Sequence, residues 1–154
     1  MIEQLKKFTN GYRVKGIKNI EGREGLGWSG TIYRNGKKIG TGDDYADGGP
    51  SRLRIPDSEE REALLKWAKE LLPECQYEVE NMFIEELVNY ELAIKRMKVI
   101  ARKKLMKYET DKLDTNGIPT TFSTWNFPDS PEVRTKILER YPDTNFLNDE
   151  LADW

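Results

Sequence analysis

The sequence predicts an α+β fold, in which an antiparallel β-meander of three to four strands precedes a mainly helical segment. Three observations lead to this fold class. An Asn-Gly pair at residues 35–36 lies between two segments of alternating polarity, as in a two-residue β-hairpin turn. Apolar residues recur every three or four positions over about residues 77–104, as in a long helix. A Ser-Pro-Glu sequence at 130–132 is typical of a helix start, because proline suits the first helical position.

The N-terminal part is expected to form a sheet after a short helix. Residues 2–9 have the apolar spacing of a helix and are followed by Asn10-Gly11, a pair that ends helices. A polar, glycine-rich turn at 21–25 separates the first two strands. The expected strands lie near residues 12–20, 27–34 and 37–42, with a short fourth strand at 51–55.

The two-residue loop fixes the register of the central hairpin. The residues expected opposite each other are Arg34 and Lys37, Tyr33 and Lys38, and Ile32 and Ile39. Alternation along the strands then places Trp28 and both isoleucines on one face, and the tyrosine with its lysine partner on the other face.

Two helices are expected after the sheet. Asp57 suits an N-cap, Glu60 completes a capping-box pattern, and Pro73 ends the first helix. The second, long helix is apolar on two nearly opposite sides, so it is either central in its fold or packed against a partner chain. The central position is the favoured interpretation. One stripe runs from Val79 to Leu105, and the other consists of Val88, Leu92, Val99 and Met106.

The segment after the long helix has two interpretations. Residues 105–112 and 119–126 could form a hairpin around a turn at 114–117. Residues 105–112 could instead be the end of the long helix. A last helix is expected from residue 130 to about residue 141.

The composition is that of one folded domain with a charged surface. Charged residues make up 34% of the chain, and 4 Trp, 7 Tyr and 5 Phe supply the large apolar surfaces that a core needs. With 154 residues, the chain is long enough to bury such a core. A single domain is therefore expected over residues 1–154, mainly β over 1–56 and mainly helical over 57–154.

The chain has no His and a single Cys, Cys75, so Ser–His or Cys–His nucleophilic pairs and tetrahedral zinc sites cannot be built from it. Neither catalysis nor a cofactor is expected. A lone cysteine fits a reducing compartment, and we find no signal peptide and no apolar stretch suited to a membrane span. A cytoplasmic protein is expected, and the net charge of −2 disfavours nucleic acid as a partner.

An acidic loop is one candidate site. It contains Asp43, Asp44 and Asp47, but it does not follow the EF-hand template, because Tyr45 and Arg54 occupy the third and twelfth positions. An acidic turn in contact with water is favoured over a Ca²⁺ or Mg²⁺ site. A carboxylate- and metal-dependent enzyme built on these aspartates is the third of three functional hypotheses.

The glycine-rich β region is a candidate ligand site. Glycine amides followed closely by arginines could accept a phosphate, and nearby aromatic rings could stack on a small nucleotide. Turn geometry in a curved sheet is the competing explanation for the glycines. The second hypothesis is therefore a small-ligand or nucleotide-binding protein. Its candidate binding residues are Trp28, Tyr33, Tyr45, Gly48, Gly49, Arg52 and Arg54.

The long helix offers a candidate surface for a partner. Bases on its C-terminal part form a strip that could meet phosphates or an acidic protein surface, although a solvated helix face is the favoured interpretation. The apolar residues of the second stripe would mark a homo-oligomer interface if they were exposed in a monomer. The residues concerned are the basic Lys95, Lys98, Arg102 and Lys103, and the apolar Val88, Leu92 and Val99.

Residues 21–39, which read EGREGLGWSGTIYRNGKKI, resemble a recurrent segment of small phage- and plasmid-encoded proteins of unknown role. The tail, at residues 130–132, 141–142 and 146–148, is similar to the end of such proteins. The resemblance implies a mobile-element setting, in which compact non-enzymatic proteins often block host defence systems. The first hypothesis is therefore a non-catalytic binding protein that inhibits or sequesters a host protein in the host cytoplasm.

Overall fold

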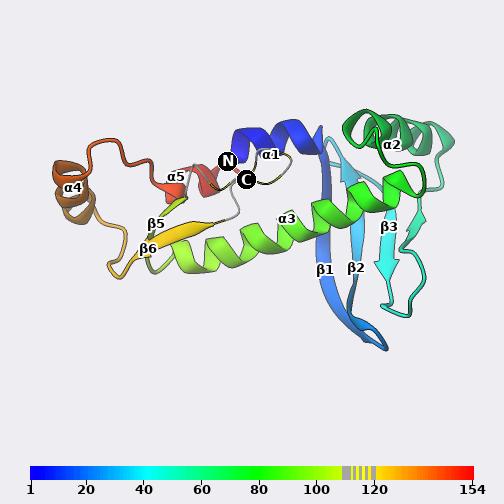
Figure 1. Cartoon of the computed structure of the whole chain (residues 1–154), viewed down its shortest axis with the longest axis horizontal. Coiled ribbons are helices and arrows are strands. Elements are labelled where there is room, and N and C mark those ends of the chain that lie inside the picture. The colour runs from blue at the N-terminus through cyan, green and yellow to red at the C-terminus, as the bar shows by residue number, and fades with distance from the viewer. Residues whose placement is uncertain (109–111, 113, 115, 117, 119–120) are drawn as a thin grey trace. The chain divides into compact units, whose positions relative to one another are not determined.

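The computed structural model describes residues 1–108, 112, 114, 116, 118 and 121–154. Four strands form an antiparallel sheet at the N-terminus, and two more form a small sheet between the long helix and the C-terminal helices. The predicted α+β fold class is confirmed. In chain order the elements are α1 (Ile2–Thr9), β1 (Tyr12–Gly22), β2 (Gly25–Arg34), β3 (Lys37–Asp44), β4 (Arg52–Arg54), α2 (Ser58–Leu71), α3 (Val79–Ala101), β5 (Leu105–Tyr108), β6 (Phe122–Trp125), α4 (Pro131–Arg140) and α5 (Leu147–Ala152) (Figure 1).

The chain divides into two compact units. The sheet unit consists of residues 9–92, and the C-terminal unit consists of residues 93–154 together with residues 1–8. The long helix α3 therefore contributes its first part to the sheet unit and its last part to the C-terminal unit. Each unit buries large apolar side chains, among them Ile32 in the first and Leu147 in the second.

The strands of the sheet unit follow one another in the order β1-β2-β3-β4. The turn between β2 and β3 has φ values of 48° at Asn35 and 80° at Gly36, as a type I′ turn requires. The predicted pairs of Arg34 with Lys37 and of Tyr33 with Lys38 are confirmed.

The predicted pair of Ile32 with Ile39 is wrong. The register shifts between Ile32 and Tyr33, and Ile32 lies opposite Gly40. The extra residue in β3 forms a β-bulge, a local irregularity that strict alternation does not reveal. Ile32, Ile39 and Trp28 are nevertheless all buried, in agreement with the shared face that alternation predicts.

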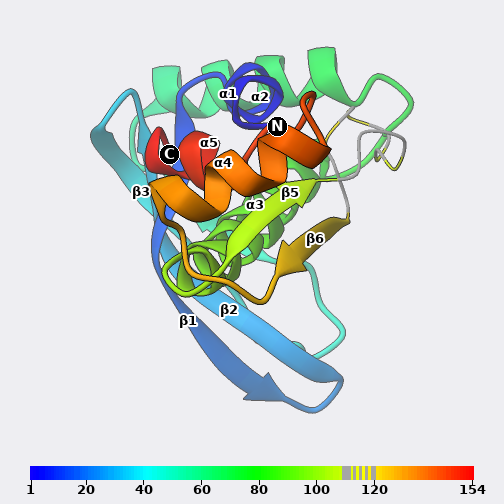
Figure 2. The same ribbon diagram turned by 90° about the vertical axis from the view of Figure 1, so that its left-hand side faces the viewer.

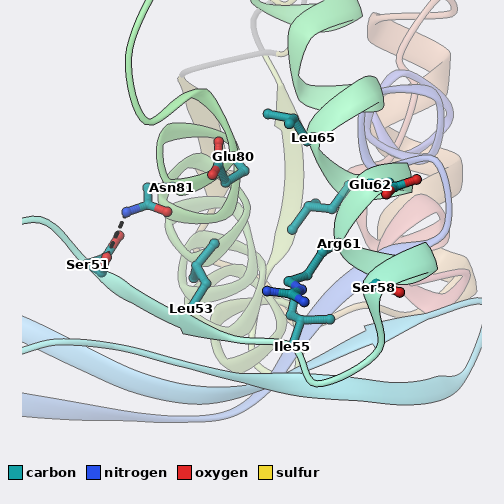
Figure 3. A pocket seen from close by; sticks show the side chains of 10 residues that line it. Ser51, Leu53, Ile55, Ser58, Arg61, Glu62, Leu65, Glu80 and Asn81 are labelled. Carbon is teal, nitrogen blue, oxygen red and sulfur yellow. Dashed lines mark hydrogen bonds between the residues drawn. The ribbon is translucent and has the colours of Figure 1, made fainter.

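Helix α2 and the first part of α3 lie on the same side of this sheet (Figure 3). Asp57 caps α2 as predicted, because its carboxylate accepts hydrogen bonds from two amides of the first turn. The Glu60 carboxylate accepts a hydrogen bond of 3.0 Å from Arg34, which ties α2 to β2. The rings of Tyr12 and Phe83 meet edge to face with centroids 5.7 Å apart and tie β1 to α3.

Helix α3 spans Val79–Ala101, slightly less than the predicted 77–104. Its second apolar stripe changes environment along its length: Val88 is buried, Leu92 is half-buried and Val99 is 53% exposed. The stripe is therefore not one continuous exposed interface. Within the part of the chain that is described, we find no helix with the length and apolar content needed to span a bilayer.

The C-terminal unit contains the predicted hairpin. Residues 105–108 form a strand rather than the end of the helix, and β5 pairs with β6 from Leu105–Trp125 to Tyr108–Phe122. Residues 109–111, 113, 115, 117, 119 and 120 of the expected hairpin lie outside the described residues. Helix α4 begins as predicted, since the Ser130 hydroxyl accepts a hydrogen bond of 3.3 Å from the Val133 amide.

Helix α5 is not predicted by the sequence analysis. It has only 6 residues, and its N-cap, Phe146, makes no side-chain capping bond, so the usual capping signal is missing. Its position depends on packing instead. Phe146 joins Leu105 and Ile137 in a buried cluster that Trp125 and Val133 flank. In Figure 2, α4 and α5 lie beside the β5–β6 hairpin.

Candidate functional site

Three of the predicted ligand-binding residues lie together near the end of β3 and β4. The guanidinium carbon of Arg52 lies 5.1 Å from the centroid of the Tyr45 ring. Arg52 also pairs with Asp47, with 3.4 Å between the guanidinium nitrogen Nη2 and the carboxylate oxygen Oδ2. Arg54 pairs with Asp43. Because both guanidinium groups already have carboxylate partners, they are less available to a phosphate than the sequence suggests.

Asp43 is the buried member of this cluster, with 4% of the residue exposed. Arg54 donates a hydrogen bond to its Oδ2, and this bond is the main cause that raises the pKa of Arg54 above its ordinary value. The other oxygen, Oδ1, has no hydrogen-bond partner among the described residues. A buried carboxylate needs a counter-charge, so we interpret Arg54 as the structural partner of Asp43.

The other predicted aromatic residues do not join this cluster. Trp28 is buried, with 7% of the residue exposed. Tyr33 is half-buried and lies under the ammonium group of Lys15, whose nitrogen is 5.2 Å from the ring centroid. Neither ring therefore offers a free face beside the arginines for a nucleotide base.

The glycine pair of the loop is a poor place for an anion. A Cβ added at Gly48 would lie 2.8 Å from a carboxylate oxygen of Glu24. The amide of Gly49 donates a hydrogen bond of 3.2 Å to Asp47. A phosphate bound here would meet two carboxylates, and one of the two glycine amides is already occupied.

The three aspartates of the acidic loop are engaged separately. Asp43 accepts from Arg54, and Asp44 accepts a hydrogen bond of 2.7 Å from the Ala46 amide. Asp47 accepts from the Gly49 amide and from Arg52. Across residues 1–108, 112, 114, 116, 118 and 121–154, no group of three or more carboxylate or thiol side chains is placed to hold a metal ion.

The predicted basic strip lies on the last part of α3. Lys95, Arg102 and Lys103 are exposed, and Lys98 is half-buried. Lys98 and Arg102 line a hollow of about 280 Å³ together with Asp129 of the same unit. An acid thus lines the same hollow as the strip, but its carboxylate pairs with Arg134.

A cavity of the sheet unit that could hold a ligand lies on the other face of β4. Side chains alternate along this strand, so Leu53 points away from the face of Arg52 and Arg54. Leu53 and its neighbours Ser51 and Ile55 line a cavity of about 450 Å³, which α2 and the first turn of α3 complete. The volume is within the range of small-molecule sites, roughly 300–1,000 Å³.

One wall of the cavity carries a buried polar group that is not satisfied. Ser51 is 4% exposed, and its Oγ has no hydrogen-bond partner among the described residues. The Asn81 side chain of α3 donates a hydrogen bond of 2.7 Å to the carbonyl oxygen of Ser51 (Figure 3). This bond ties the residue that precedes β4 to the first turn of α3 at the cavity wall.

The charged groups of the cavity come from the two helices. Arg61 and Glu62 belong to α2, and Glu80 belongs to α3. None of the three side chains has a hydrogen bond or an ion pair with another described residue. Figure 3 shows the Arg61 guanidinium above Ile55 and the Glu80 carboxylate near the opposite wall. The Arg61 guanidinium and the Glu80 carboxylate thus lie at different walls of the cavity, while Glu62 lies on the same helix as Arg61.

This cavity was not predicted from the sequence. Arg52 and Arg54 were selected for their charge, although alternation along β4 places them on the face opposite Leu53. A usable signal was present in α2, where Arg61 precedes Leu64 by three positions and Leu65 by four. This spacing brings a charge onto the apolar face of the helix, which indicates a site or a buried contact.

Comparison of the chain with protein-family models, with curated proteins and with solved structures found no match.

Proposed function

We propose that the protein acts by binding rather than by catalysis, and that its cavity between β4, α2 and the start of α3 binds a small ligand. The single observation that carries this proposal is a cavity of about 450 Å³ whose lining combines apolar side chains with the charged groups of Arg61 and Glu80, which are unpaired among the described residues. Small-molecule sites are typically concave and mostly apolar, with a few polar groups that orient the ligand.

The lining defines the chemistry of the ligand. Leu53, Ile55 and Leu65 offer apolar contacts, which favour an apolar body. Arg61 offers a planar set of donors that matches a carboxylate or a phosphate. Glu80, near the other wall, can accept a hydrogen bond from an amine or a hydroxyl. We therefore propose an amphipathic ligand with an anionic group at one end.

A small nucleotide fits this cavity less well. Recognition of a base depends on stacking against aromatic rings, and the described lining contains none. The arginines first considered for phosphate binding, Arg52 and Arg54, are paired with aspartates on the other face of β4. The proposal thus keeps the small-ligand hypothesis but moves its site.

The experiment that tests the proposal is release of bound small molecules from the purified full chain, followed by mass spectrometry. Leu53→Trp fills the cavity, whereas Leu138→Trp adds the same bulk at an exposed position of α4. We expect one compound to be released from the wild type and from Leu138→Trp but not from Leu53→Trp. Release of the same compound from all three proteins would reject the cavity as its site.

A second candidate function is capture of a host protein in the host cytoplasm. The resemblance of residues 21–39 to segments of phage- and plasmid-encoded proteins supports this setting. The observation that favours it in the fold is the exposure of large apolar side chains in the C-terminal unit, including Phe127 at 58% and Tyr141 at 50%. A host protein that the wild type retains and that the double variant Phe127→Ala, Tyr141→Ala loses would support capture. Equal retention by the wild type and the double variant would count against it.

A further inference from the structure

A groove in the C-terminal unit has an apolar floor and a basic rim. It lies between the end of β6 and one side of α4 and has a volume of about 630 Å³. We call it the α4 groove. Its apolar side chains are those of Trp125, Phe127, Val133, Ile137 and Tyr141.

The helix positions explain why α4 presents this surface. Val133, Lys136, Ile137 and Arg140 are spaced by three, one and three residues, so they share one side of the helix. Val133 and Ile137 contact the buried cluster of the unit and form the floor. Lys136 and Arg140 flank that floor, and Tyr141 follows at the end of the helix.

Both charged residues that line the groove are basic. The two charged lining residues are Lys136 and Arg140, and neither forms an ion pair with another described residue. A third base, Lys107 of β5, has its nitrogen 6.0 Å from the centroid of the Trp125 ring. Arg140 lies 5.6 Å from the centroid of the Tyr141 ring. Lys107 and Arg140 thus each lie beside an aromatic ring of the groove.

We infer that the α4 groove binds an acidic segment of a partner protein, in which bulky apolar side chains are flanked by aspartates or glutamates. The apolar side chains would pack on Trp125, Phe127 and Ile137, and the carboxylates would pair with Lys136 and Arg140. Aromatic and arginine side chains are the usual energetic centres of such interfaces. The inference does not depend on a ligand in the cavity, and it gives a partner class to the second candidate function.

Single-stranded nucleic acid also binds aromatic and basic surfaces, but the floor of the groove favours a peptide. Aliphatic side chains, Val133 and Ile137, form this floor, and these suit apolar side chains better than bases.

The test uses three fluorescein-labelled probes and the full chain. One probe is a peptide with phenylalanine and leucine flanked by glutamates, the second has lysines in place of the glutamates, and the third is an oligothymidine of similar length. Fluorescence anisotropy should show saturable binding of the glutamate peptide alone. Stronger binding of the oligothymidine, equal binding of both peptides, or no saturable binding of the glutamate peptide would each overturn the inference.

A charge swap locates the binding. The double variant Lys136→Glu, Arg140→Glu should bind the glutamate peptide about tenfold more weakly, because each exposed ion pair contributes modestly to the affinity. The same variant should bind the lysine peptide. The matched control is Lys7→Glu with Arg96→Glu, which reverses two exposed bases of the same unit outside the groove and should change neither affinity. Circular dichroism would establish that both double variants are folded.

Equal effects of the two double variants on the peptide affinities would contradict the assignment of binding to the groove. If the Lys136→Glu, Arg140→Glu variant still captured a host protein, this inference about the groove would fail while the capture hypothesis would stand.

Discussion

The side-chain nitrogen of Asn81 donates a hydrogen bond of 2.7 Å to the carbonyl oxygen of Ser51. This bond joins the first turns of α3 to the residue that precedes β4, at the wall of the cavity. Since Ser51 is buried, loss of the bond would leave its carbonyl without this donor. The contact therefore supports both the fold of the sheet unit and the shape of the proposed site.

Replacement of Asn81 should destabilise the protein. Asn81→Ala removes the donor and leaves a buried carbonyl unsatisfied, which costs about 1–3 kcal/mol. The matched control is Asn89→Ala, at an exposed position of the same helix, which should change the free energy of unfolding much less. Urea denaturation measures both. A similar change for both variants would mean that the bond to Ser51 has no special role.

Asn148 should stabilise the C-terminal unit in the same way. Its side chain donates to the carbonyls of Ala101 and Lys104 at 3.1 Å and 3.0 Å and accepts from the Met106 amide at 2.8 Å. Asn148→Ala removes three bonds at the end of α3, and we expect a loss of about 2–3 kcal/mol. Asn145→Ala, at an exposed position, is the control for urea denaturation. Equal midpoints for wild type and Asn148→Ala would contradict the expectation.

Gly40 should tolerate no side chain. A Cβ at this position would lie 2.3 Å from the carbonyl oxygen of Arg54, which is a backbone atom of the neighbouring strand. Gly40→Ala must therefore displace β4, and we expect a loss of about 1–3 kcal/mol. Gly49→Ala is the control, because its nearest neighbour is a side-chain oxygen at 3.2 Å. Thermal unfolding should separate the two variants, and equal melting temperatures would argue against close contact at Gly40.

The Asp129–Arg134 pair should make the free energy of unfolding depend on pH in the acid range. Its hydrogen bonds from Arg134 lower its pKa below the usual 3.8. The unfolded chain therefore binds a proton at this site at a higher pH than the folded chain does. The stabilisation is fully present above pH 3.8 and is lost as the pH falls through the lowered pKa. Asp129→Asn should reduce the loss of stability below this pH, and Asp143→Asn, at an exposed position, should not. Identical pH profiles for wild type and Asp129→Asn would contradict the role of this pair.

Local sequence signals predicted the elements of the fold well. The turn at Asn35-Gly36, the cap at Asp57 and the start at Ser130 each depend on residues within a few positions, so the sequence carries the whole signal. The bulge that places Ile32 opposite Gly40 depends on packing between strands. Helix α5 depends on the burial of Phe146 and lacks a side-chain cap. Neither can be derived from local patterns.

The candidate site was predicted less well, because it is assembled from distant segments. The predicted ligand residues Arg52 and Arg54 belong to β4, as Leu53 of the cavity does, but they lie on the opposite face of that strand. The two arginines were selected because they are charged. Their pairing with aspartates became visible only in the folded structure. The proximity of Ser51 to Asn81, thirty positions apart, likewise required the folded chain.

The most direct test of a ligand site at Arg61 is amide chemical-shift mapping with octanoate, a probe that has an apolar chain and one carboxylate. We predict saturable shifts in the cavity segments, residues 51–65 and 79–81, and their loss in Arg61→Gln. Lys66→Gln, at an exposed position of the same helix, should leave the shifts unchanged. Shifts centred elsewhere, or shifts that persist in Arg61→Gln, would contradict the central claim that this cavity binds an anionic amphipathic ligand.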